Sequence, residues 1–232
     1  METIYDRTRM LIGRTALEKL RSKSVLVIGL GGVGGHAVEA LARTGIGTLG
    51  IADCDKVDIT NINRQIIALQ STIGRQKTEV MTERIRSINP DIVVKGYDVR
   101  VTEENIDSLD LAEYDYIIDA VDDVKAKLAI IEEAVRLERP VVSCMGTGNK
   151  LDPLRLQIKP VEKSHTCPLA KVIRKELSLR GIKRIPVVFS DEMPSKAEID
   201  PGDGRTPASI SFVPASAGMV LASKAVRDLM ES

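Results

Sequence analysis

The sequence predicts an α/β fold in which a mostly parallel sheet is flanked by helices and extended by antiparallel strands in the C-terminal third. Three observations support this prediction. The apolar run 24–28 breaks abruptly into a turn rich in glycine. From there to residue 144, apolar runs of strand length alternate with segments of helical length, as they do in right-handed β-α-β crossovers. Beyond residue 146 this alternation weakens and short extended runs follow, which favours antiparallel pairing.

The turn after residue 28 reads Gly29-Leu30-Gly31-Gly32-Val33-Gly34. Glycine is needed there because the chain bends sharply, because a Cβ atom would hold phosphates off the backbone, and because the next helix packs closely on the strand. That helix, expected over residues 35–43, would direct its free N–H groups at a phosphate. The spacing of the glycines predicts a Rossmann-like dinucleotide site; the alternative is a strand-to-helix turn without a ligand.

The composition narrows the class of protein. The 33 basic and 33 acidic residues cancel, so contact with nucleic acid or an anionic membrane would need a local patch. The three cysteines form no Cys-x-x-Cys pair, and no apolar run approaches the roughly 18 residues of a transmembrane segment. We therefore expect a soluble, cytoplasmic protein. Its length suits a single ATP-binding domain over residues 1–232, with an N-terminal helical arm (1–22), a nucleotide-binding core (23–148) and a C-terminal elaboration (149–232).

The remaining elements follow from apolar periodicity and turn residues. Two helices are expected in the N-terminal arm, at 4–13 and 15–20, the second opening on a capping box of Thr15 and Glu18. Further helices are expected at 76–88, 103–111, 124–137, 169–179 and 217–230. Strands are expected at 48–53, 92–97, 116–121 and 141–144, and extended runs at 154–158, 185–189 and 209–213.

Polar residues concentrate after the second strand. Asp53 ends that strand about 20 residues beyond Gly34, where a carboxylate can bind ribose hydroxyls, although a solvated loop acid is the alternative. The chain then reads Asp53-Cys54-Asp55-Lys56-Val57-Asp58-Ile59-Thr60-Asn61-Ile62-Asn63-Arg64-Gln65. Hydride transfer has no need of so many donors and acceptors. The residues that we expect to bind nucleotide are Gly29, Gly31, Gly32, Gly34, Asp53, Asp55, Asn61, Arg64, Gln65, Lys77 and Asp122.

Two cations and two acids indicate a triphosphate. Arg64, and Lys77 at the start of a predicted helix, could neutralise the charge of departing pyrophosphate. Asp119 and Asp122 belong to the end of the strand 116–121 and are expected to flank the crevice, with Asp122 holding Mg²⁺ against the phosphates. We expect Lys77 and Asp122 to be exposed there. Each residue alone also fits a surface charge or a helix cap, but jointly they favour ATP with Mg²⁺.

These motifs together resemble the ubiquitin-activating-like adenylating enzymes, a family that includes bacterial activators of sulfur-carrier proteins for thiamine and molybdopterin. The resemblance covers roughly residues 5–148 and rests on the glycine turn, Asp53, the segments 61–65 and 119–123, and Lys77. It implies that Arg64 and Lys77 bind the phosphates and that Asp122 binds magnesium. It also implies a homodimer in which Arg7 of the arm reaches the neighbouring subunit's site; alternatively, Arg7 caps or pairs within its own helix.

One branch of that family is especially similar. The chain lacks the two Cys-x-x-Cys zinc pairs usual in sulfur-carrier activators, whereas its stretches 40–47, 60–66, 79–81 and 88–90 resemble the branch that modifies tRNA. Enzymes of that branch use ATP to adenylate the carboxylate of threonylcarbamoyladenosine, which then closes into a ring with net loss of water. The resemblance therefore implies tRNA carrying threonylcarbamoyladenosine as partner, with a sulfur-relay protein or cysteine desulfurase as a further one. The alternatives are activation of a ubiquitin-like sulfur carrier, an NAD-dependent oxidoreductase, and a non-catalytic nucleotide-binding module.

Other candidates carry weaker signals. Cys167 could be a thioester nucleophile with His165 near it, whereas Cys54 and Cys144 are expected to be structural. His36 follows the glycine turn and is expected to pack rather than to act as a base. For tRNA the best local feature is the segment 163–184, which holds seven cations and a single acid. A solvated helix face explains that segment equally well.

Overall fold

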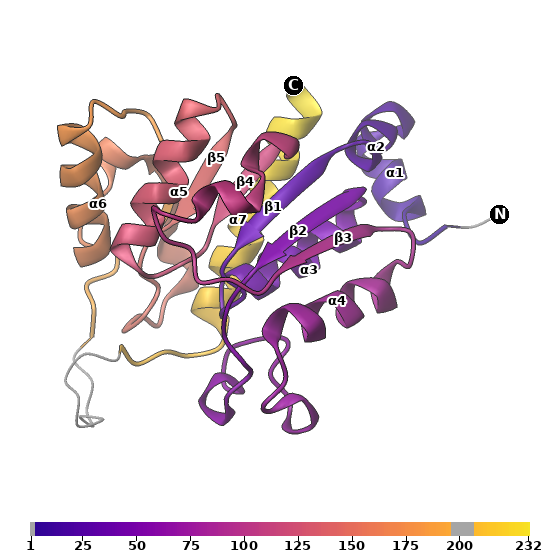
Figure 1. Ribbon diagram of the computed structural model, residues 1–232, viewed down its shortest axis with the longest axis horizontal. Helices are drawn as coiled ribbons and strands as arrows, with labels where there is room; N and C mark the ends of the chain where they lie inside the picture. Colours follow the sequence, from indigo (N-terminus) through magenta and orange to yellow (C-terminus); the bar gives the residue numbers. More distant parts are fainter. Residues whose placement is uncertain (1–2, 196–206) are drawn as a thin grey trace.

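A computed structural model describes residues 3–195 and 207–232. Its centre is a seven-stranded sheet in the order β3-β2-β1-β4-β5-β7-β6 (Figure 1). All neighbouring strands are parallel except the pair β6 and β7. The strands are β1 (Ser24–Ile28), β2 (Thr48–Ala52), β3 (Val93–Tyr97), β4 (Tyr116–Asp119), β5 (Val141–Cys144), β6 (Leu156–Pro160) and β7 (Pro186–Ser190).

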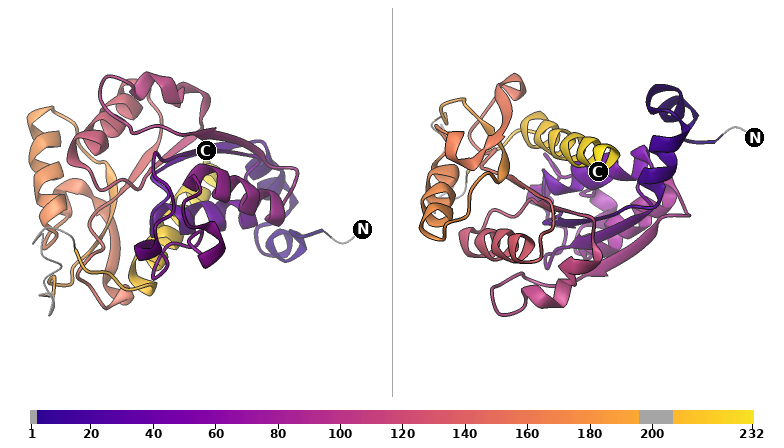
Figure 2. Two further views of the ribbon diagram at one scale, coloured as in Figure 1. Left: turned by 60° about the horizontal axis from the view of Figure 1, so that its bottom comes forward. Right: turned by 90° about the horizontal axis from the view of Figure 1, so that it is seen from above.

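Helices cover both faces of the sheet, as the two views in Figure 2 show. The helices are α1 (Asp6–Ile12), α2 (Arg14–Arg21), α3 (Gly34–Thr44), α4 (Lys77–Ile88), α5 (Val124–Arg136), α6 (Pro168–Leu179) and α7 (Phe212–Glu231). Alternate residues of β1 serve the two faces: Val25 and Val27 pack with α3, α4 and α7, whereas Leu26 and Ile28 pack with α5 and α6. This alternation explains why residues 25–28 are all apolar and buried, as expected of a strand buried on both sides.

The strand order creates the site. The chain moves outward from β1 to β2 and β3, then returns to β4 on the other side of β1. The loops that leave the carboxyl ends of β1 and β4 therefore diverge and open a crevice between them. The predicted mostly parallel sheet with an antiparallel extension is thus confirmed, with antiparallel pairing confined to β6 and β7.

Three predictions about local structure are wrong. Residues 103–111 form no α-helix but the 3₁₀ turns Ile106–Leu109 and Leu111–Glu113, separated by Asp110 in a left-handed conformation. The run 209–213 is not extended, because α7 already begins at Phe212. Pro214 is tolerated there since the first helical turn has no intrahelical bond for it to break. The Thr15 capping box is also absent: α2 begins at Arg14 with Gly13 as its N-cap and no side-chain cap bond.

The N-terminal arm packs on the body of its own chain. Tyr5 is buried; its hydroxyl donates to Ala42 O at 3.2 Å and accepts from Asn89 Nδ2 at 2.8 Å. Leu17 and Leu20 of α2 are buried as well. Helix α1, in contrast, buries none of its residues. Among the helices of residues 3–195 and 207–232, none combines the length and apolarity that crossing a membrane requires.

Candidate nucleotide-binding site

The glycine turn has the shape of a phosphate cradle. Gly29 has φ +93°, and a Cβ atom there would lie 2.8 Å from Ala120 O, so the turn packs directly on the loop after β4. A Cβ atom on Gly34 would lie 1.8 Å from Gly29 O, so only glycine allows α3 to start this close to β1. The Cβ position of Gly31 is open, with its nearest neighbour 4.0 Å away. The backbone at Gly31 is therefore free for a ligand to approach.

Asp53 fixes the turn from the end of β2. One of its carboxylate oxygens accepts from the Leu30 backbone N–H at 2.7 Å, and the other accepts from the Asp55 N–H at 2.8 Å. The carboxylate thus connects the turn after β1 to the turn after β2. Its predicted contact with a ribose stays a prediction.

Lys77 is buried, contrary to the expectation that it would be exposed. Its side chain is only 6% exposed, and Nζ lies 3.0 Å from Asp55 Oδ2 and 3.7 Å from Asp53 Oδ1. Burial opposes ionisation of Asp55, but the hydrogen bond and charge of Lys77 outweigh it, so the pKa of that carboxyl is lowered. The sequence does not indicate this burial, because Asp53 and Asp55 lie more than 20 residues before Lys77 in the chain.

The segment 61–65 borders the same space. Asn61 has a structural role, because its Oδ1 accepts from the Asp58 N–H at 3.2 Å and closes a capping box on a 3₁₀ turn. Arg64 donates to Thr60 O at 2.9 Å, and a Cβ atom on Gly32 would lie 3.1 Å from its Cγ. Gln65 is buried, and its Oε1 has no hydrogen-bond partner among the described residues.

Asp119 and Asp122 have different surroundings. Asp119 is fully buried and accepts from Lys127 Nζ at 2.7 Å and from Ser143 Oγ at 2.6 Å. It does not flank the crevice, so that prediction is wrong; a lysine of α5 neutralises the carboxylate inside the core. Asp122 is exposed and lines the crevice, and within the described part of the chain it forms no ion pair.

The crevice is a cleft of about 1210 Å³. It brings together all but one of the residues expected to bind nucleotide, namely Gly29, Gly31, Gly32, Asp53, Asp55, Asn61, Arg64, Gln65, Lys77 and Asp122. Gly34 lies behind the lining, in the first turn of α3. Arg7 lies elsewhere, exposed on α1 beside Met10 and Leu11. Sequence reasoning missed Arg100 and Lys125, which also line the cleft. Neither residue belongs to a sequence motif that would have indicated a binding site.

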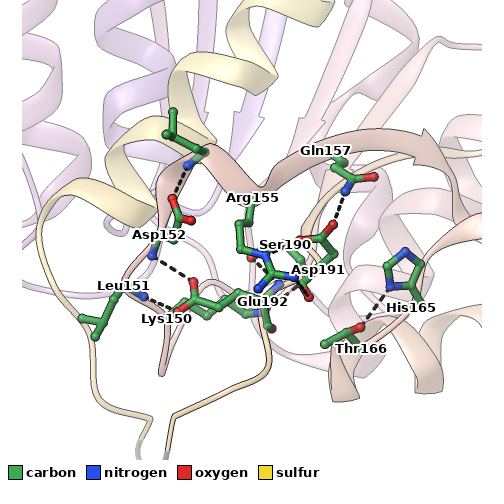
Figure 3. A network of polar contacts seen from close by, with 11 residues as sticks. Lys150, Leu151, Asp152, Arg155, Gln157, His165, Thr166, Ser190, Asp191 and Glu192 are labelled. Carbon is green, nitrogen blue, oxygen red and sulfur yellow. Dashed lines mark hydrogen bonds and ion pairs between the residues drawn. The ribbon is translucent and has the colours of Figure 1, made fainter.

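Residues 144–148, at the end of β5 and after it, form one wall of the cleft. A polar network holds the chain that follows them (Figure 3). Lys150 is buried and donates to Ser190 O at 3.2 Å and to Glu192 O at 2.8 Å. Burial lowers the pKa of its ammonium group. The Glu192 carboxylate in turn accepts from the N–H groups of Leu151 and Asp152, both at 2.9 Å. This network ties the β5–β6 connection to the end of β7.

The cysteines and histidines form no catalytic pair. His165 Nδ1 lies 2.9 Å from Thr166 Oγ1 (Figure 3), and its ring packs edge-on against Phe189. Cys167 is buried with Sγ 3.9 Å from Gly146 O, which favours a structural role. Burial raises the pKa of the Cys144 thiol to about 12. Burial also lowers the pKa of His36, whose Nε2 lies 3.4 Å from Arg64 O.

One group of residues has the spacing of a metal site. Ligand atoms of Asp53, Cys54 and Asp55 lie within 4.8 Å of one another. The ammonium of Lys77 already balances both carboxylates, so an additional cation there would meet a positive charge. Asp122 is one of the carboxylates lining the cleft that form no ion pair with the described residues.

Comparisons with known proteins identify the family of the chain. The sequence profile of the ThiF family matches residues 5–231. The tRNA threonylcarbamoyladenosine dehydratase of Bacillus subtilis (strain 168) is 40% identical over 240 residues, which cover 98% of this chain and 94% of the relative. The enzyme of that name from Escherichia coli (strain K12) is 40% identical over 196 residues, covering 81% and 73% of the two chains. The crystal structure of E. coli tRNA N6-threonylcarbamoyladenosine dehydratase, TcdA, in complex with ATP has a TM-score of 0.90 at 37% identity and covers 98% of this chain and 93% of that chain. The chain therefore belongs to the ThiF family.

Proposed function

We propose that this protein is an ATP-dependent adenylating enzyme that dehydrates threonylcarbamoyladenosine in tRNA to a cyclic product. The observation that carries the proposal is the convergence of the glycine turn, Arg64, Lys77 and Asp122 in one cleft. Two relatives named tRNA threonylcarbamoyladenosine dehydratase match over most of the chain, and the crystal structure of the E. coli enzyme contains ATP.

The residues present fit ATP. The open backbone at Gly31 and the helix N-terminus behind it suit the phosphates. Gln65 Oε1 is a buried acceptor that lacks a partner among the described residues, which a donor group of the ligand could supply. The volume of the cleft, about 1210 Å³, exceeds that of ordinary ligand pockets of roughly 300–1,000 Å³, leaving room for a second substrate.

The proposed chemistry begins with the substrate carboxylate, a poor electrophile. A carboxylate oxygen attacks the α-phosphorus of ATP, and pyrophosphate leaves from the opposite side. A nucleophilic atom within the same threonylcarbamoyl group then attacks the activated carbonyl carbon and loses a proton, and AMP leaves with the carboxylate oxygen. Arg64 and Lys77 stabilise charge during the first step. The second step is intramolecular, so holding the substrate in position is the main requirement.

Asp122 fits Mg²⁺, because it is an exposed carboxylate on the cleft wall that forms no ion pair with the described residues. Bound Mg²⁺ would neutralise charge on the phosphates of ATP. The Asp122 side chain would hold the ion while the glycine turn holds the nucleotide.

We further propose a cytoplasmic homodimer that acts as one ATP-binding unit over residues 1–232, with Arg7 serving the partner's site. Helix α1 supports this, since Met10 and Leu11 are 84% and 86% exposed beside Arg7. An apolar helix face of this kind is typical of a surface that a second copy covers. A sulfur-relay or cysteine desulfurase partner stays a prediction without an assigned surface.

Release of AMP identifies the substrate. The purified protein should release AMP from ATP and Mg²⁺ when given tRNA that carries threonylcarbamoyladenosine, and not when given the same tRNA without that group. Release with a small carrier protein ending in Gly-Gly would indicate a sulfur-carrier activator instead. Binding of NAD in preference to ATP would indicate an oxidoreductase, and ATP binding without turnover would indicate a nucleotide-binding module.

A further inference from the structure

Five exposed cations gather at the end of the molecule formed by α6. Lys171 and Lys175 lie one turn apart on the solvent side of α6. Lys163 ends the 3₁₀ turn Val161–Lys163 beside that helix, and Lys183 and Arg184 follow it. We refer to these five residues as the basic end.

Hydrogen bonds connect two of the segments that form the basic end. The Arg184 N–H donates to Glu162 Oε1 at 2.7 Å, and the Val161 N–H donates to Ile185 O at 2.8 Å. The 3₁₀ turn that carries Lys163 therefore lies beside the chain that carries Lys183 and Arg184. Helix α6, which carries Lys171 and Lys175, contacts the same 3₁₀ turn, so the three segments lie next to one another.

The charges of the basic end are only partly balanced: the pKa of Glu162 is lowered by the hydrogen bond from the Arg184 N–H and by the charges of Arg184 and Lys183. None of its five cations forms an ion pair within the described part of the chain, whereas Arg180, at the end of α6, is held by Glu132 and by Glu176 at 2.7 Å. Elsewhere in the described residues, Arg43, Arg75 and Arg84 are paired with carboxylates, although Arg86 and Arg227 are not. In a chain of zero net charge, this is a local excess of positive charge facing solvent.

The helix that carries Lys171 and Lys175 borders the cleft at its first turn. Leu169, in the first turn of α6, lines the cleft, and a Cβ atom on Gly146 would lie 3.9 Å from its Cβ. The 12 residues of α6 span about 18 Å, which is a few phosphate spacings of a nucleic acid. The cleft itself carries Asp53, Asp55 and Asp122 beside its cations, so it cannot attract a phosphodiester chain by charge alone.

We propose that the basic end docks the phosphate backbone of tRNA next to the adenosine held in the cleft, an inference that rests on the proposed function. Lysine is a mobile point charge that suits phosphates rather than base edges. The protein has no tryptophan and only 2 phenylalanines and 4 tyrosines, so stacking on bases is not the main grip. The surface thus supplies affinity, while the cleft supplies selectivity for the modified adenosine.

Charge reversal at two positions tests the proposal. The variant Lys171→Glu with Lys175→Glu should bind unmodified tRNA at least tenfold more weakly in a fluorescence titration. The slope of log affinity against log salt should fall by about 2, because two phosphate contacts are lost. With modified tRNA, the KM for tRNA should rise by the same factor while kcat at saturation stays unchanged, since neither lysine lines the cleft.

Two matched variants control for charge and fold. Arg86→Glu with Arg227→Glu makes the same change in net charge at exposed residues of α4 and α7 and should leave affinity for tRNA near that of the original protein. Lys171→Arg with Lys175→Arg keeps the charge and should keep the affinity. Thermal melting of each variant shows that the fold is retained.

The outcomes separate the two proposals. If the original protein releases AMP on modified tRNA but reversal at 171 and 175 changes neither affinity nor salt slope, the basic end is not the docking surface, and the proposed function stands. If reversal weakens tRNA binding as expected but no tRNA elicits AMP, the surface stands and the proposed function fails. Equal weakening of tRNA binding by the α4 and α7 control would overturn the docking surface. So would a result in which reversal at 171 and 175 abolishes binding to phosphatidylserine vesicles but leaves binding to tRNA unchanged.

Discussion

Lys77 Nζ lies 3.0 Å from Asp55 Oδ2, in an ion pair at the edge of the glycine turn that removes the lysine almost entirely from solvent. The pair gives Lys77 two roles. It balances the carboxylates at the end of β2, and it places a cation in the lining of the cleft. Binding of a triphosphate would therefore compete with Asp55 for the same ammonium group.

Replacing Lys77 by alanine should impair catalysis and stability together. An electrostatic group of this kind contributes about 3 kcal/mol to the transition state, so AMP formation should fall about a hundredfold or more. Loss of the buried partner of Asp53 should lower the free energy of unfolding by roughly 1–3 kcal/mol. AMP assays and urea titration measure the two effects. Lys77→Arg, which keeps the charge, should retain most of the stability; an alanine variant with normal turnover would remove Lys77 from the site.

Two glycines of the turn should respond differently to alanine. In Gly31→Ala the new Cβ has open space, so the protein should fold normally but bind ATP more weakly, because the methyl group occupies the approach to the backbone. In Gly34→Ala the new Cβ would lie 1.8 Å from Gly29 O, so the fold itself should be strongly destabilised. Thermal melting and ATP titration distinguish the two. Unchanged ATP affinity in Gly31→Ala would argue against a phosphate at that position.

Glu39 should make stability depend on pH. Burial opposes its ionisation, but Arg84 and Arg43 hold the carboxylate at 2.6 Å and 2.7 Å and lower its pKa. Because the folded-state pKa is the lower one, the stabilisation is complete above the ordinary pKa of 4.5 and is lost as pH falls through the folded-state value. The difference in unfolding free energy between the original protein and Glu39→Gln should thus be constant near neutral pH and shrink in acid. A difference that grows in acid contradicts this assignment.

Arg7 can be tested by mixing two inactive variants. If Arg7 acts in the partner's site, a dimer of one Arg7→Ala and one Asp122→Asn subunit pairs an intact core with an intact arm. Random exchange makes about half the dimers mixed, each with one working site of two, so activity should return to about a quarter. Exchange is verified with differently tagged subunits. No recovery after verified exchange would mean that Arg7 serves its own subunit or no site.

Much of the fold could be predicted because the sheet is built from local signals. The strand 24–28, the glycine turn and the strand 141–144 have apolar or glycine patterns whose meaning does not depend on distant residues. The start of α7 could not be predicted in this way. Gly218 looks like an interruption, yet a Cβ there would lie 2.3 Å from Val33 O, so this glycine permits close packing of α7 on α3. The residues of that contact stand in another part of the chain.

The site could be predicted as a set of residues but not as a set of environments. Spacing and polarity singled out most of the residues that line the cleft. The sequence could not show that Asp119 pairs with Lys127 in the core while Asp122 faces the cleft. Both are aspartates at the end of the same predicted strand, and the sequence pattern does not distinguish a buried carboxylate from an exposed one. The position of Lys77 at the start of a predicted helix likewise predicts an exposed side chain, yet Lys77 is buried. Burial of charge depends on tertiary partners, which one-dimensional patterns do not contain.

The most direct measurement of the central claim follows the carboxylate oxygen. Modified tRNA is prepared with heavy oxygen in the carboxylate of the threonylcarbamoyl group and incubated with the protein, ATP and Mg²⁺. If the carboxylate is adenylated, mass spectrometry should find one heavy oxygen in the phosphate of AMP for each nucleoside that has lost the elements of water. Asp122→Asn should give neither product at a comparable rate. Heavy oxygen in inorganic phosphate, or a cyclised nucleoside formed with unlabelled AMP, would contradict adenylation of the carboxylate.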